Sequence, residues 1–106
     1  MTTFNDREKA FEKKFERDQD LQFKLTARKN KMLGLWAAGL MGKSGADAEA
    51  YAKEVVVADF VEAGDEDVVR KVKADLEAAG AQVSDHQIRR KMEELLAVAI
   101  QQMRNT

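Results

Sequence analysis

Glycine-marked breaks divide this chain into segments whose apolar residues recur at the spacing of an α-helix, and no proline interrupts any segment. The clearest segment follows Ser84, where apolar residues three or four positions apart would share one helix face. They are Ile88, Met92, Leu95, Leu96, Ala99 and Met103. Ser84 and Gln87 form the S-x-x-Q pattern of a capping box, which marks a helix start. No segment is a convincing strand, so we expect an all-α fold.

Two further segments have the same character. Between Ser44 and Gly64 the apolar residues again follow helical spacing, and they are Ala48, Tyr51, Ala52, Val55, Val56 and Phe60. Ser44 and Asp47 can form a capping box there, and Gly64 can end the helix. The next helix is expected to begin in the acidic run 65–67, because carboxylates suit the positive end of a helix dipole. It presents Val68, Val69, Val72 and Leu76, and Gly80 ends it.

The first segment is long, because no strong stop appears between about Asn5 and Leu40. Its two halves differ. From Leu25 onward it carries a broad apolar stripe, formed by Leu25, Met32, Leu33, Trp36 and Leu40. Gly34 and Gly39 would let another helix approach closely. We therefore predict a four-helix protein with a compact helical domain over 25–106 and a flexible N-terminal arm over 1–24, which is the projecting part of the long first helix.

The arm carries a narrow apolar ridge in a highly charged surrounding. Phe4, Phe11 and Phe15 fall at i, i+7 and i+11, which places them on one helix face. Acidic residues at positions 8, 12, 16 and 20 follow one flank of this ridge, and Arg7 and Lys14 lie on the other. The like charges four residues apart destabilise an isolated helix.

Burial of the ridge alone cannot keep the arm folded. Burying three phenylalanines stabilises by roughly 5–9 kcal/mol, whereas fixing about 15 backbone residues costs on the order of 15–30 kcal/mol. Hydrogen bonds offset part of that cost. We infer that the arm becomes helical in the groove of a partner protein. Packing of the ridge on the chain's own domain, and self-association, are the alternatives.

Charge is distributed unevenly along a chain whose net charge is only −1. Residues 1–31 carry nine Lys or Arg against six Asp or Glu, residues 43–85 carry five against eleven, and residues 86–106 carry four against two. Such polarity is typical of surfaces that meet different partners. The overall balance gives no reason to expect nucleic acid as a partner.

The inventory of reactive side chains argues against an enzyme. There is no cysteine and only one histidine, His86, which we interpret as a surface residue near a helix start. No carboxylate pair, metal-ligand cluster or nucleophile–base set stands out, so neither a metal nor a firmly bound cofactor is expected. No run approaches the roughly 18 apolar residues of a membrane span. We expect a cytoplasmic protein without direct membrane insertion.

Two short segments could contact phosphate. Gly42, Lys43 and Ser44 match the end of a P-loop, but Ala37 replaces the first glycine of that motif and no strand precedes it. Weak ATP, ADP or anion binding at this turn is therefore the second functional hypothesis. The basic segment 24–32 is interpreted as a solvated helix face, because aromatic residues do not alternate with its cations.

Several motifs together resemble one known family. They are "DREKAFEKKFERDQDLQFK", "ARKNKMLGLWAAGLMG", "SGADAEAYAKEVV", "EAGDEDV" and "SDHQIRRKMEELLA". In order and spacing, from Phe4 to about Gln102, the chain resembles the alphaproteobacterial ATP synthase zeta subunit, an ATPase inhibitor family. The resemblance implies a four-helix protein that binds the catalytic head of the F-type ATP synthase. It also implies that the protein blocks rotation during ATP hydrolysis.

The resemblance further implies which residues bind the partner. The inhibitory part would be the N-terminal arm, with Phe4, Arg7, Glu8, Ala10, Phe11, Lys14 and Phe15 as its contact residues. The partner would be the catalytic head, both its catalytic subunits and its central stalk, so the chain would lie peripheral to the inner membrane. We expect the free protein to be a monomer.

Overall fold

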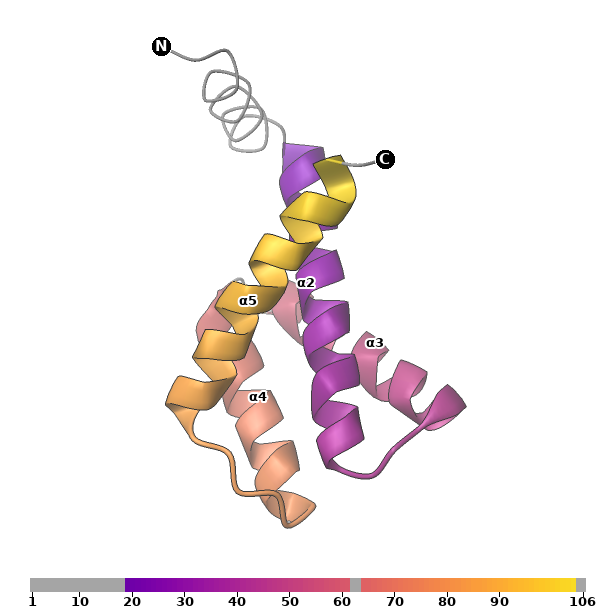
Figure 1. Ribbon diagram of the computed structural model, residues 1–106, viewed down its shortest axis with the longest axis vertical. Helices are drawn as coiled ribbons and strands as arrows, with labels where there is room; N and C mark the ends of the chain where they lie inside the picture. The colour runs from indigo at the N-terminus through magenta and orange to yellow at the C-terminus, as the bar shows by residue number, and fades with distance from the viewer. Residues whose placement is uncertain (1–18, 62–63, 105–106) are drawn as a thin grey trace.

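The computed structural model describes residues 19–61 and 64–104 (Figure 1). These ranges contain four helices and no strand: α2 (Gln19–Leu40), α3 (Gly45–Val61), α4 (Asp65–Ala78) and α5 (Asp85–Arg104). The all-α, four-helix prediction is confirmed. Residues 1–18 lie outside the described residues, so the division into an arm over 1–24 and a domain over 25–106 stays a prediction.

Helix α2 is the element against which the other three helices pack. Its contribution to the apolar core comes from small or aliphatic residues, of which Leu33, Ala37 and Ala38 are fully buried. The predicted apolar faces of α3, α4 and α5 meet around them, and the core is completed by Tyr51, Val55, Val68, Val69, Val72, Leu76, Ile88 and Met92. Trp36 packs at the edge of this core, where the Lys91 Nζ atom of α5 lies 5.7 Å from the ring centroid.

The glycines of α2 differ in what surrounds them. A Cβ at Gly34 would lie 2.6 Å from the Cα of Ala52, so the missing side chain is what allows α3 to approach α2 this closely. A Cβ at Gly39 would meet nothing within 4 Å. The expectation of close approach is therefore right for Gly34 and wrong for Gly39, which lies in the last turn of α2, beyond the crossing with α3.

Helices α2 and α4 both end in a Schellman motif, in which a glycine adopts a left-handed conformation. At the end of α4, Gly80 has φ +84°, its N–H donates to the Glu77 carbonyl at 3.0 Å, and the Ala81 N–H donates to the Leu76 carbonyl at 2.9 Å. At the end of α2, Gly42 has φ +80° and makes the corresponding bond to the Gly39 carbonyl at 3.1 Å. These ends fix the directions in which the following loops leave.

Not every predicted core residue is buried. Leu40 is 47% exposed, because it lies in the final turn of α2, where Ala37 and Ala38 take the buried positions. Leu96 is 36% exposed, at the edge of the α5 face that buries Ile88. Leu40 and Leu96 are both expected in the buried apolar stripes of their helices. Helical periodicity predicts the face on which a residue lies, but it does not show how far a neighbouring helix covers that face.

Candidate functional site: docking surfaces of the helical domain

The contact residues expected in the arm are not among the described residues. Phe4, Arg7, Glu8, Ala10, Phe11, Lys14 and Phe15 all precede Gln19, where α2 begins. The described residues do show which part of the helical domain lies nearest to the arm. The start of α2 crosses the end of α5 (Figure 1), and the Arg28 Nη1 atom donates a hydrogen bond to the Gln102 Oε1 atom at 3.1 Å.

The turn Gly42–Lys43–Ser44 follows α2 directly. The Lys43 N–H donates to the Ala38 carbonyl at 2.9 Å, and with the Gly42 bond this leaves both amides committed to the end of α2. Ser44 is exposed and immediately precedes Gly45, the first residue of α3. The structure thus gives this turn a role in joining two helices, and nucleotide binding there stays a prediction.

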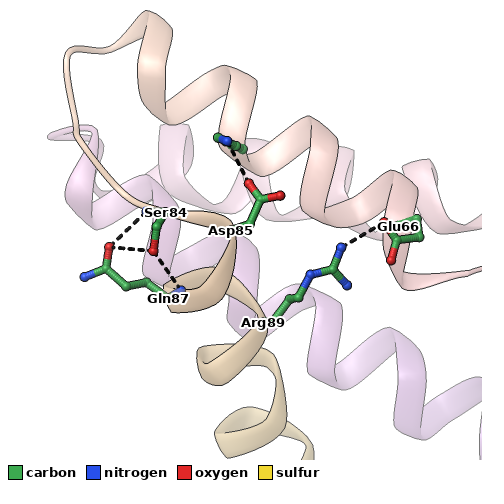
Figure 2. A network of polar contacts seen from close by, with 6 residues as sticks. Glu66, Ser84, Asp85, Gln87 and Arg89 are labelled. Carbon is green, nitrogen blue, oxygen red and sulfur yellow. Dashed lines mark hydrogen bonds and ion pairs between the residues drawn. The ribbon is translucent and has the colours of Figure 1, made fainter.

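A polar network joins the start of α5 to α4 (Figure 2). The capping box is present as predicted: the Gln87 N–H donates to the Ser84 Oγ atom at 3.1 Å, and the Ser84 N–H donates to the Gln87 Oε1 atom at 2.9 Å. Beside it, the Lys73 Nζ atom lies 2.8 Å from the Asp85 Oδ1 atom, and the Arg89 Nη2 atom lies 2.8 Å from the Glu66 Oε2 atom.

The ion pairs of this network line a polar pocket of about 380 Å³ between α4 and α5. The hydrogen bond and charge of Arg89 lower the pKa of Glu66, and the hydrogen bond from Lys73 lowers the pKa of Asp85. Each of these carboxylates therefore remains ionised beside a cation. The arrangement fixes α5 on α4 and does not present a free acid or base.

A second polar contact joins α3 to α4. The Tyr51 hydroxyl donates to the Asp75 Oδ2 atom at 2.8 Å, and the Lys71 Nζ atom lies 3.0 Å from the same oxygen. Lys71 also lies 5.4 Å from the centroid of the Tyr51 ring. Burial, followed by the hydrogen bond to Asp75, raises the pKa of Tyr51, so its hydroxyl stays protonated and serves as a donor.

Helix α2 buries two polar residues, with different outcomes. Lys29 is 7% exposed, and its Nζ atom lies 2.9 Å from the Asp65 Oδ1 atom at the start of α4. Asn30 is fully buried, and neither its Nδ2 nor its Oδ1 atom has a hydrogen-bond partner in the described part of the chain. Such burial destabilises a fold by about 1–3 kcal/mol per unpaired group.

An apolar groove lies on the side of α2 that faces α3 and the end of α5, and its volume is about 520 Å³. Its apolar lining comes from Ala27, Met32 and Leu35 of α2 and from Val56 of α3. Its polar lining comes from Arg28, Lys31 and Gln102. The groove therefore combines apolar side chains with cations, and it carries Met32 and Arg28, two residue types that are enriched at protein–protein interfaces.

No three His, Cys, Asp or Glu side chains among the described residues gather as metal ligands. His86 is exposed in the first turn of α5. Within the same ranges, no helix combines the length and apolar character needed to span a bilayer.

The described residues form a small all-α domain of four packed helices. The family described as ATPase inhibitor subunit zeta matches residues 1–102 of this chain. The chain therefore belongs to the zeta family of ATPase inhibitor subunits. The match covers the arm as well as the four helices, and the resemblance read from the sequence motifs is confirmed.

A solved structure supports the same assignment. A chain whose structure was determined by solution NMR is 52% identical to this one and superposes on it with a TM-score of 0.71. The similarity covers 80% of this chain and 96% of the other. No curated protein sequence matches.

The groove is the surface that sequence reasoning missed. The segment 24–32 is expected to be a solvated helix face, and Lys24, Arg28 and Lys31 are exposed as expected, whereas Lys29 is buried and pairs with Asp65. Arg28 and Lys31 also line the groove, together with Leu35. A usable signal was present, since Lys24, Arg28, Lys31 and Leu35 recur at i, i+4, i+7 and i+11 on one helix face. Val56 and Gln102 line the groove only because α3 and α5 pack beside α2, so no spacing in the sequence predicts their place in it.

Proposed function

We propose that this chain inhibits the F-type ATP synthase by placing its N-terminal arm in the catalytic head. The observation that carries the proposal is the extent of the family match, which runs from residue 1 to residue 102 and so includes the arm. The ATPase inhibitor role follows from the family. Insertion of the arm into the catalytic head is a more specific proposal than the inhibitor role, and the sequence of the arm supports it.

The ridge of Phe4, Phe11 and Phe15 suits a helix that folds in a partner's cleft. Its burial is too small to hold the arm folded alone, so ordering and binding would occur together. In the bound state the three rings fill pockets of the head, and the flanking charges pair with the cleft walls. A packed helix between the catalytic subunits and the central stalk then has to be expelled before rotation can proceed in the hydrolytic direction.

The helical domain has a positioning role in this mechanism. Because α2 (Gln19–Leu40) contains both the last residues of the arm, 19–24, and the first residues of the domain, the domain would hold one end of the arm. The protein acts as a regulator and not as a catalyst. In its working state it lies on the catalytic head, at the cytoplasmic side of the inner membrane, and when free it is a monomer without a nucleic acid partner.

Alanine substitutions in the ridge test this proposal. Phe11→Ala and Phe15→Ala should each speed dissociation from the purified catalytic head roughly 10- to 100-fold, because each ring removed forfeits about 1.5–3 kcal/mol of burial. The melting temperature should change little. Dissociation rates from surface-immobilised head, together with inhibition of ATP hydrolysis, measure the effect.

Phe23→Ala is the matched control, because Phe23 lies in α2 and off the line of the ridge. It should leave the dissociation rate near that of the unmodified chain. If Phe11→Ala or Phe15→Ala instead lowers the melting temperature by several degrees and leaves dissociation unchanged, the ridge packs on the chain's own domain and the proposal fails.

A further inference from the structure

The geometry points to the groove on α2 as a second docking surface, and we propose that it receives an acidic amphipathic helix of the catalytic head. This inference rests on the proposed function, because it names a second contact with the same partner. The arm would supply the inhibitory element, and the groove would hold the domain against the outside of the head.

The apolar part of the groove defines the kind of element that fits. Met32, Leu35 and Val56 are only partly buried, and the groove they line measures about 520 Å³. Partial exposure of neighbouring apolar side chains along one helix is typical of a groove that accepts the apolar face of an incoming helix. Ala27 contributes only a methyl group to the lining at one end of the groove, so a helix backbone could approach closely there.

The charge along the groove defines the character of the incoming helix. Lys24, Arg28 and Lys31 are exposed and share one face of α2 at i, i+4 and i+7. Cations four residues apart repel each other on a helix. Arg28 bonds the neutral Gln102, and the Lys31 Nζ atom lies 3.7 Å from the Glu49 Oε2 atom in a pair whose two side chains are more than half exposed. Exposed pairs of this kind contribute little, so positive charge is left for acidic residues of a partner.

The position of the groove favours the head over the chain's own arm as the occupant. The bridge between Arg28 and Gln102 lies at the end of the groove nearer to Gln19, from which the arm departs. As a helix, the ridge from Phe4 to Phe15 would extend over 12 residues, about 16 Å, whereas the groove follows α2 over nine residues from Ala27 to Leu35, about 12 Å. The three rings of the ridge therefore cannot all lie in the groove at once.

The groove is also close to the surface that the arm would contact. Ala27 lies eight residues beyond Gln19, which corresponds to about 12 Å along α2. A partner that encloses the arm is thus within reach of the groove, and one partner surface can engage both. Two contacts made by one chain raise the effective concentration of each for the other.

Charge reversal tests the inference. Arg28→Glu should weaken binding of the full chain to the purified catalytic head roughly tenfold, because it opposes an acidic partner with a like charge. Arg90→Glu, an identical change on an exposed residue of α5 outside the groove, should change the affinity less than about twofold. Leu35→Ser should weaken binding independently of charge. Circular dichroism establishes that each variant is folded.

The outcomes separate the two proposals. If the unmodified chain neither binds nor inhibits the head, the proposed function fails. If it inhibits and Arg28→Glu binds as Arg90→Glu does, the groove inference alone is overturned. Tighter binding by Arg28→Glu would mean that the arm occupies the groove in the free chain. A dimer in sedimentation that Arg28→Glu dissociates would mean that a second copy occupies it. Either result also overturns the inference.

Discussion

Gly34 sets the distance between α2 and α3. At this position any side chain would meet backbone, since a Cβ there would lie 2.6 Å from the Cα of Ala52 and 3.2 Å from the Cγ2 atom of Val55. Backbone atoms in a packed helix cannot move aside as the tip of a flexible side chain can. The identity of this one residue is therefore tied to the packing of a whole helix pair.

The substitution Gly34→Ala should lower the free energy of unfolding. The added methyl group overpacks the interface between α2 and α3, and overpacking typically costs about 1–3 kcal/mol. Alanine also gains about 1 kcal/mol over glycine in helix propensity. The cost of overpacking exceeds that gain only if the clash is severe. A contact of 2.6 Å to backbone meets that condition. Urea denaturation followed by circular dichroism measures the change.

Gly39→Ala provides the control within the same helix. A Cβ at Gly39 meets nothing within 4 Å, so the substitution should keep only the gain in helix propensity and raise stability by about 0.5–1 kcal/mol. Equal effects of the two substitutions would show that the contact at Gly34 does not limit the approach of α3.

Helix α5 is held to its neighbours at both ends by polar contacts. At its start, Asp85 and Arg89 pair with Lys73 and Glu66 of α4, and near its end Gln102 accepts a hydrogen bond from Arg28 of α2. These pairs lie at the surface, where ion pairs contribute modestly. Their main consequence is a dependence of stability on pH.

Acidification should weaken the attachment of α5. The pKa of Glu66 is lowered in the folded protein by Arg89, so the stabilisation is fully present above the ordinary glutamate pKa of about 4. It is lost as the pH falls through the lower, folded-state value. The variant Glu66→Gln should therefore lose less stability than the unmodified chain between about pH 5 and pH 2, as measured by urea denaturation at each pH.

The partner residue supplies the control for this effect. In an Arg89→Met background the largest causes of the lowered pKa are absent and only the charge of Arg70 still lowers it, so Glu66→Gln should add little further change in the pH dependence. If Glu66→Gln flattens the profile equally in both backgrounds, a group other than Arg89 lowers the pKa of Glu66.

The elements show how far sequence reasoning reaches. The start of α5 was predictable because a capping box is a local signal, and Ser84 and Gln87 form its bonds as expected. All four apolar residues expected on α4 are buried. The exposure of Leu40 and the open space at Gly39 were not predictable, because they depend on where neighbouring helices cross α2. The groove was missed for the same reason, since its lining joins three helices.

At the scale of the whole molecule, the proposed function gives the two parts of the chain different tasks. The helices α2 to α5 bury a core formed by described residues. The family match runs from residue 1 to residue 102, so it also includes residues 1–18, which the structure does not describe. We therefore expect folding to depend on the four helices and inhibition to depend on residues 1–18.

Removal of residues 1–18 tests this division most directly. The truncated chain and the full chain would be compared for inhibition of ATP hydrolysis by the purified catalytic head, with far-ultraviolet circular dichroism and thermal melting of the truncated chain as the control for folding. The account predicts that the truncated chain retains the helical signal and melting behaviour of the four-helix domain and no longer inhibits. Inhibition by the truncated chain equal to that of the full chain would contradict it.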